Sequence, residues 1–214
     1  MLLGRVVLVA AWLGLVTSTL VAQVGRAPGA GPASSRQGTW LGVGVGGGAS
    51  TLHCRICEGE QGSRGISGYV RGGITLNPKL LVGAEANAWT RSDESGSQRV
   101  WSLAANGYWY PSPEHGYFLK AGLGFTRYRR WALENSSSTV QIGLLGGGLS
   151  AHLGGGYEVR VNPAMSIVPF LNLMASSQGT LSTTRDNGTQ YQRNKLANGA
   201  NVLLAQAGIG LTWH

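Results

Sequence analysis

The chain has 214 residues, of which 35 are glycine, 43% are hydrophobic and only 12% are charged, with a formal net charge of +8. The charged fraction is about half that of a typical soluble domain, which argues against an ordinary water-facing globular surface. The length is sufficient for one closed core and for at most two domains.

The N-terminal residues have the pattern of a secretory signal. Arg5 supplies a positive charge, residues 6–16 form an almost wholly apolar run, and small or polar residues lead to Ala22. This order predicts a signal peptide over residues 1–22, cleaved after Ala22. An uncleaved membrane anchor is the alternative, but the apolar run is shorter than the ~20 residues that a spanning helix needs. Residues 23–38, rich in Gly, Ala, Pro and Ser, predict a flexible lead-in.

From residue 39 onward, apolar residues alternate with small or polar residues. In the C-terminal segment Leu203, Ile209 and Trp213 share one face, and Gln206 and Thr212 share the other. A period of two is typical of a β-strand. Eight strands are predicted in this way: Thr39–Ala49, Gly65–Leu76, Leu80–Arg91, Gln98–Tyr110, Gly116–Arg130, Gly148–Val161, Ser166–Gln178 and Ala200–Trp213.

The connections between these strands alternate in length. Residues 77–79, 111–115 and 162–164 are short turns that contain proline, whereas 50–64, 92–97, 131–147 and 179–199 are mostly longer and polar. This alternation is typical of outer-membrane barrels. Because lipid offers no hydrogen bonds to an open strand edge, an apolar sheet face there requires closure. We therefore predict an all-β, eight-stranded antiparallel up-and-down transmembrane β-barrel over residues 39–214. A soluble lipocalin-like barrel, with its apolar face inward, is the alternative.

Three glycine-rich stretches carry a resemblance to a known family. Residues 42–46, 120–124 and 207–213 read Gly-Val-Gly-Val-Gly, Lys-Ala-Gly-Leu-Gly and Ala-Gly-Ile-Gly-Leu-Thr-Trp. In combination they resemble the outer-membrane β-barrel superfamily of OmpA/OmpX-like eight-stranded domains. The resemblance implies a bacterial outer-membrane location. An even number of strands puts both termini on the short-turn side, which is then the periplasm, with the long loops extracellular, and we expect a monomer. It also implies recognition by the barrel-assembly machinery through a terminal aromatic residue, here Trp213, which is followed by His214.

The sequence favours a non-enzymatic barrel with a structural, envelope-stabilising or surface-binding role such as adhesion. The alternative is a narrow pore or a lipid A-modifying enzyme, because lipid A deacylases and palmitoyltransferases of this family use a Ser and a His on the outer rim. Ser150 and His152 share one strand face, but that face is predicted to point into the barrel and offers no obvious carboxylate to orient the His. We therefore predict no catalytic residue.

Two further motifs are candidates for a binding site. Cys54 and Cys57 flank a two-residue gap in the first long loop, beside His53. A local disulfide is favoured there over a metal or redox site, because exported proteins meet an oxidising compartment. The Gly42-x-Gly44-x-x-Gly47 pattern lacks the helix that a dinucleotide site needs and is interpreted as a strand of small residues. No metal and no cofactor are expected.

Basic residues gather where the strands approach the long loops. Arg127, Arg129 and Arg130 stand at the end of one predicted strand, at the height where an outer leaflet would carry phosphate groups. Export argues against nucleic acid as the partner of this positive charge. The predicted partner is therefore outer-membrane lipopolysaccharide, and the alternative is that these charges only keep the rim solvated.

Five charged residues are predicted to form a network inside the barrel. The register through the turn at residues 77–79 places Arg71 opposite Glu85 on the polar face. Lys120 and Glu158, counted from their own turns on neighbouring strands, are predicted to form a second pair, with Arg160 just below. Buried charges are tolerated only when paired, so this network would close the lumen.

Overall fold

The computed structural model describes residues 36–53, 62–93, 96–133, 141–186 and 191–214. All of these belong to one compact unit, Pro32–His214. The predicted signal peptide, most of the predicted lead-in, and Cys54 and Cys57 lie outside the described residues.

The described part of the chain is built from β-strands. They are β1 (Thr39–His53), β2 (Ser63–Asn77), β3 (Leu80–Asp93), β4 (Gly96–Trp109), β5 (Tyr117–Leu133), β6 (Gln141–Tyr157), β7 (Val159–Asn162), β8 (Met165–Ser177), β9 (Thr180–Asp186), β10 (Tyr191–Asn198) and β11 (Asn201–Trp213). Among the described residues, no helix is long and apolar enough to cross a membrane.

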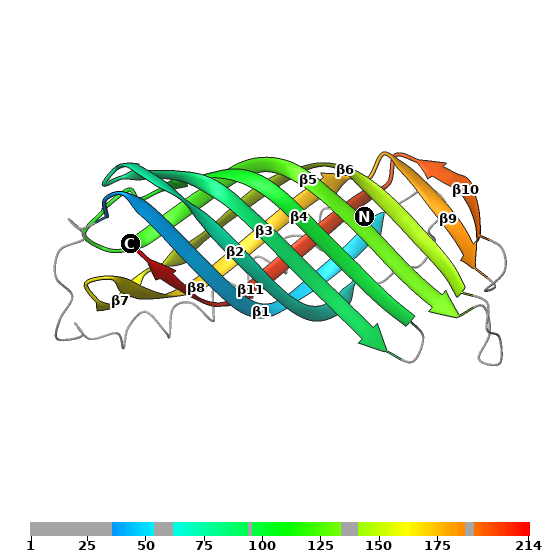
Figure 1. The fold of residues 1–214 in the computed structure, drawn as a ribbon, viewed down its shortest axis with the longest axis horizontal. Helices are drawn as coiled ribbons and strands as arrows, with labels where there is room; N and C mark the ends of the chain where they lie inside the picture. The colour runs from blue at the N-terminus through cyan, green and yellow to red at the C-terminus, as the bar shows by residue number, and fades with distance from the viewer. Residues whose placement is uncertain (1–35, 54–61, 94–95, 134–140, 187–190) are drawn as a thin grey trace, which may run out of the picture. The chain divides into compact units, whose positions relative to one another are not determined.

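Eight of these strands close into an antiparallel barrel (Figure 1). Consecutive strands pair from β1 to β6, β6 then pairs with β8, and β8 pairs with β11. The barrel closes because β11 pairs with β1 from Leu41 opposite Trp213 to His53 opposite Asn201. The predicted eight-stranded up-and-down barrel is thus confirmed, and its first strand begins at the predicted residue. In two of the short turns the Asn77 and Asn162 side chains each accept a hydrogen bond from the backbone N–H two residues later, at 2.9 Å.

The polar segment 179–199, predicted as a loop, instead contains the hairpin strands β9 and β10. This hairpin continues β8 and β11 beyond the barrel, and β9 pairs with the first residues of β6 (Figure 1). Gly179 and Gly199, with φ of 55° and 77°, lie where the hairpin leaves the barrel. The period-two pattern did not predict this hairpin, because residues 179–199 do not form an apolar face. Its threonines and the Asn187-Gly188 pair in the sequence are nevertheless strand and hairpin-turn signals.

The predicted strand Gly148–Val161 differs from the structure at both ends. β6 begins at Gln141, inside the predicted loop, because its first residues gain β9 as a hydrogen-bonding neighbour. At the other end the strand is interrupted at Glu158, and the short β7 follows.

The two faces of the barrel have opposite character. Side chains that point outward are apolar and exposed, for example Leu149 at 78%, Leu123 at 73% and Ile66 at 72%. Side chains that point inward include most of the buried polar and charged residues. A sheet that is apolar outside and polar inside suits lipid surroundings, and it excludes the lipocalin-like alternative.

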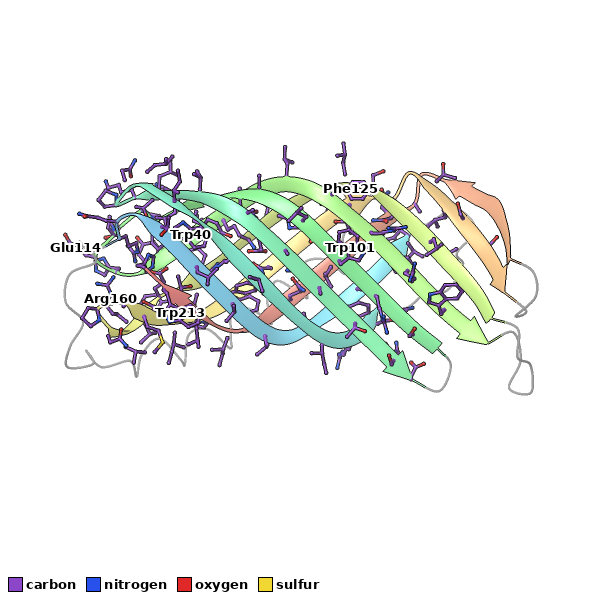
Figure 2. All side chains as sticks on the ribbon, in the orientation of Figure 1. Trp40, Trp101, Glu114, Phe125, Arg160 and Trp213 are labelled. Carbon is purple, nitrogen blue, oxygen red and sulfur yellow. The ribbon has the colours of Figure 1, made fainter. Side chains whose placement is uncertain are left out.

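Aromatic residues mark both edges of the apolar outer surface. We name the two barrel ends by their connections: the short-turn end, where β1 starts and β11 finishes, and the long-loop end. Trp109 is exposed at the short-turn end of β4. Trp213 is exposed at the same end, and Trp101 and Phe125 are exposed toward the long-loop end (Figure 2). The eight residue steps from Trp109 to Trp101 rise roughly 20 Å at ~3.3 Å per step and ~40° tilt, close to the ~25 Å apolar band of such barrels.

We expect Gly148 to be intolerant of a side chain. A Cβ atom on this residue would overlap the carbonyl oxygen of Ser177 on the neighbouring strand. Gly148→Ala should therefore lower the free energy of unfolding by about 1–3 kcal/mol, measured by urea unfolding followed by tryptophan fluorescence. Gly47→Ala is the matched control, because its nearest neighbouring atom would be 3.8 Å away. Equal stability of the two variants would contradict the close strand approach.

Candidate functional site

The lumen is filled by two apolar clusters with polar side chains between them. The cluster toward the long-loop end contains Leu52, Trp89, Val100, Tyr128, Met174, Leu181, Ala200, Val202 and Leu204. The cluster toward the short-turn end contains Trp40, Leu81, Tyr108, Tyr110, Phe118 and Val168. An eight-stranded barrel has an interior just wide enough for side chains to fill it, and here they do so at both ends.

Glu85 and Lys120 form the central ion pair of the lumen. The Lys120 ammonium donates to both carboxylate oxygens of Glu85, at 2.8 and 3.0 Å, and both side chains are 1% exposed. The Tyr108 hydroxyl donates a further hydrogen bond to the same carboxylate at 3.1 Å. Glu85 thus has three short contacts that compensate the loss of water around its charge.

Arg71 lies opposite Glu85 in the strand register, as the turn predicts, but it does not form an ion pair with it. Its guanidinium donates to the Thr212 hydroxyl at 3.1 Å and lies over the Tyr69 ring, 4.9 Å from the ring centroid. The register fixes which Cα atoms are close. It does not fix which of two cations reaches the carboxylate, and Lys120 takes that place.

The predicted pair between Lys120 and Glu158 is wrong. The register places Lys120 opposite Gly154, which leaves Glu158 four residues, or roughly 13 Å, further along the strand. Counting residues from two different turns did not account for this offset. Arg160 is partly exposed, lies opposite Ser166 of β8, and contributes to neither ion pair.

Glu158 instead binds three residues at the short-turn end that lie just outside the strands. Arg36 donates to one carboxylate oxygen through Nε at 3.0 Å and Nη2 at 2.9 Å. The Tyr110 hydroxyl donates to the other oxygen at 2.6 Å, and His214 Nε2 lies 3.4 Å from that oxygen. We name Arg36, Tyr110, Glu158 and His214 the mouth cluster.

The mouth cluster joins both ends of the described barrel to one carboxylate. Arg36 precedes β1, and His214 follows β11. Burial raises the pKa of Glu158, but the hydrogen bond from His214, the charge of Arg36 and the hydrogen bond from Tyr110 outweigh it, and the pKa is lowered to about 2. Sequence reasoning missed this cluster because Arg36 lies in a segment without any periodic pattern, and only the closed fold brings it to Glu158.

The basic residues near the long-loop end divide between the two faces of the sheet. Arg127 and Arg129 point outward and are exposed, whereas Arg130 has the opposite parity and is half-buried. The prediction that Arg127, Arg129 and Arg130 form one rim is therefore wrong for Arg130, because side chains alternate between the two faces along β5. The outward surface gains Arg99, which lies directly opposite Arg129, beside Trp101 opposite Arg127.

We name Arg99, Arg127 and Arg129 the basic rim. Like charges directly across an antiparallel pair are destabilising by themselves. Within the described ranges, no carboxylate forms an ion pair with any of the three. Arg129 also lies over the Trp131 ring, 5.8 Å from its centroid. Among the described residues, the basic rim is thus a positive surface beside aromatic rings that no ion pair neutralises.

Ser150 and His152 form a buried hydrogen-bonded pair. The Ser150 hydroxyl lies 3.0 Å from His152 Nε2, and both side chains point into the lumen. No described carboxylate accepts a hydrogen bond from the imidazole, so among the described residues the third group of a nucleophilic triad is not in place. The described residues also hold no cluster of three or more His, Cys, Asp or Glu side chains suited to a metal ion.

Comparison with known proteins agrees with this architecture. A family model for the autotransporter β-domain matches residues 68–214. The chain belongs to this family. No curated protein sequence matches the chain.

Solved structures show the fold of this autotransporter β-domain. The attachment invasion locus protein Ail of Yersinia pestis has a TM-score of 0.53 and 11% identity, and the match covers 82% of this chain and 99% of Ail. A major outer membrane protein of Thermus thermophilus has a TM-score of 0.55 at 12% identity, with 81% and 99% covered. Neisserial surface protein A has a TM-score of 0.50 at 12% identity, with 82% and 96% covered. The fold is that of a bacterial outer-membrane eight-stranded β-barrel.

We expect Glu85→Gln to destabilise the barrel by about 3 kcal/mol or more, because it leaves the Lys120 ammonium buried without its partner. Replacing both residues, as Glu85→Gln with Lys120→Met, should recover much of that loss. The measurement is urea unfolding in detergent micelles or lipid vesicles. A double variant as unstable as the single one would show that the ion pair is not the source of the effect.

The mouth cluster predicts a specific acid sensitivity. Because the folded-state pKa of Glu158 is about 2 and an unfolded Glu has a pKa of ~4.3, the unfolded chain binds the proton first. The stabilisation by Glu158 is therefore complete above pH ~4.5 and is lost as the pH falls toward 2. The urea midpoint of the wild type should fall across this range more steeply than that of Glu158→Gln. Glu114→Gln, which changes an exposed carboxylate at the same end, should keep the full wild-type slope.

Proposed function

We propose that this outer-membrane β-barrel is a non-enzymatic, monomeric surface-binding protein whose basic rim binds the phosphate groups of lipopolysaccharide. The proposal places the long loops outside the cell and both termini in the periplasm. The C-terminal strand ending at Trp213 is then the segment that the barrel-assembly machinery recognises. The binding would link the barrel to its neighbours in the outer leaflet and so stabilise the envelope.

The observation that carries this proposal is the opposition of Arg99 and Arg129 on the outer face. Two arginines directly opposite each other on neighbouring strands repel each other unless an anion lies between them. Guanidinium groups match the geometry of phosphate oxygens and can donate two hydrogen bonds to one group. Arg127 lies opposite Trp101, and Arg99 and Arg129 lie two residues nearer the long-loop end, at the height where headgroup phosphates would follow the apolar band.

A solved relative supports the choice of an anionic ligand. Ail of Yersinia pestis has been crystallised in complex with the heparin analogue sucrose octasulfate, and that structure has a TM-score of 0.54 and 14% identity to this chain. A sulfated sugar and a phosphorylated glycolipid offer the same kind of oxyanion to an arginine. The alternative of a narrow pore is disfavoured by the apolar clusters and ion pairs that fill the lumen.

We expect the double variant Arg99→Gln with Arg129→Gln to bind purified lipopolysaccharide at least about tenfold more weakly, a loss of ~1.4 kcal/mol. The control is Lys79→Gln with Arg160→Gln, which removes the same charge at the short-turn end. Binding of the wild type should weaken as salt rises, because the rim is exposed. An equal loss in both double variants would mean that only net charge matters, and no loss in either would mean that the rim is merely solvated.

A further inference from the structure

A groove on the outer surface of the barrel adjoins the basic rim. It has a volume of about 800 Å³ and is formed by residues of β1, β2, β3, β4 and β11. The outward-pointing residues that line it are Val43, Val45, Gly68, Val70, Ala86, Ala88, Trp101, Ile209 and Leu211. None of these carries a polar group except the indole N–H of Trp101, so the groove is suited to an apolar occupant.

The groove exists because small residues lie between large ones. Gly68 and Ala88 line its middle, and the exposed side chains of Val45 and Trp101 stand on either side of these two along one row of paired residues. Ala86 lies in the next outward row, opposite Val70. The neighbouring residues Tyr69, Asn87 and Ser102 turn their side chains into the lumen, where they are buried. The groove therefore opens outward and does not lead into the lumen.

One end of the groove meets the basic rim. Ala88 lies opposite Trp101, and Trp101 lies opposite Arg127. Arg99 precedes Trp101 by two residues in β4, nearer the long-loop end and on the same outward face, and it lies opposite Arg129. An apolar surface, an aromatic ring and a cluster of arginines thus follow one another across neighbouring strands.

We propose that the groove and the basic rim together bind one molecule of lipid A, with an acyl chain in the groove and a phosphate on the rim. This inference rests on the proposed function, because it uses the same arginines for the phosphate. The volume lies within the ~300–1,000 Å³ range of ligand pockets. The order of apolar and basic groups matches an amphiphile whose anionic headgroup lies above its chain, and a free sugar phosphate would leave the apolar part of the site unused.

The experiment measures binding of purified lipid A to the full chain in detergent by native mass spectrometry. Ala88→Leu fills the groove without adding charge, and Ala86→Leu is a second variant of the same kind. Ala121→Leu is the matched control, because Ala121 also points outward and is exposed but lies outside the groove. We expect the groove variants to bind lipid A at least about fivefold more weakly than the control, or ~1 kcal/mol, with unchanged heat-dependent migration in SDS gels.

A second ligand separates this inference from the function on which it rests. The deacylated lipid A headgroup, a glucosamine disaccharide bisphosphate, should bind equally to Ala88→Leu and Ala121→Leu, and more weakly to Arg99→Gln with Arg129→Gln. If lipid A binds equally to the groove variants and the control while the rim variant still loses the headgroup, the groove inference is wrong and the proposed function stands. If the rim variant loses neither ligand, both are wrong.

Discussion

The pairing of β11 with β1 is the interaction on which the rest of this structure depends. The outer face of the sheet is apolar and suits a lipid environment, in which an unpaired backbone N–H or C=O has no partner. The thirteen cross-strand pairs between these two strands remove the last open edge of the eight-stranded barrel. In the closed barrel, one face of every strand points toward lipid and the other toward the lumen. Polar side chains within the apolar band must therefore fit into a narrow lumen.

That confinement explains how the buried charges are arranged. Glu85 and Glu158 are each surrounded by donors from distant parts of the chain: Lys120 and Tyr108 for the first, Arg36, Tyr110 and His214 for the second. Each carboxylate draws together segments that backbone pairing alone would not connect. Removing one partner of either carboxylate would leave a buried charge without compensation. This costs more stability than replacing the carboxylate and its partners together by uncharged residues.

The outer surface follows a gradient along two neighbouring strands. On β4 and β5, the outward pairs change from Leu103 with Phe125 to Trp101 with Arg127, and then to Arg99 with Arg129. The alternation of inward and outward side chains keeps polar groups off the lipid-facing surface within the apolar band. Just beyond the band, the same alternation places three arginines on that outer surface. The groove beside Trp101 adds an apolar depression to that surface, made by residues too small to fill the space between their neighbours.

The sequence by itself determined the barrel, because alternation with a period of two is a local property that each strand displays independently. It also determined the Arg71 to Glu85 register, since the short turn fixes which residues of β2 and β3 are opposite. The ion-pair partners were decided only by the tertiary structure: Lys120 crosses the lumen to Glu85, and Arg36 reaches Glu158 from 122 positions away. The attachment of β9 to the first residues of β6 and the position of Arg99 opposite Arg129 were likewise decided by pairing between strands. Contacts of this kind depend on side-chain reach and closure across the barrel, which leave no pattern in the order of neighbouring residues.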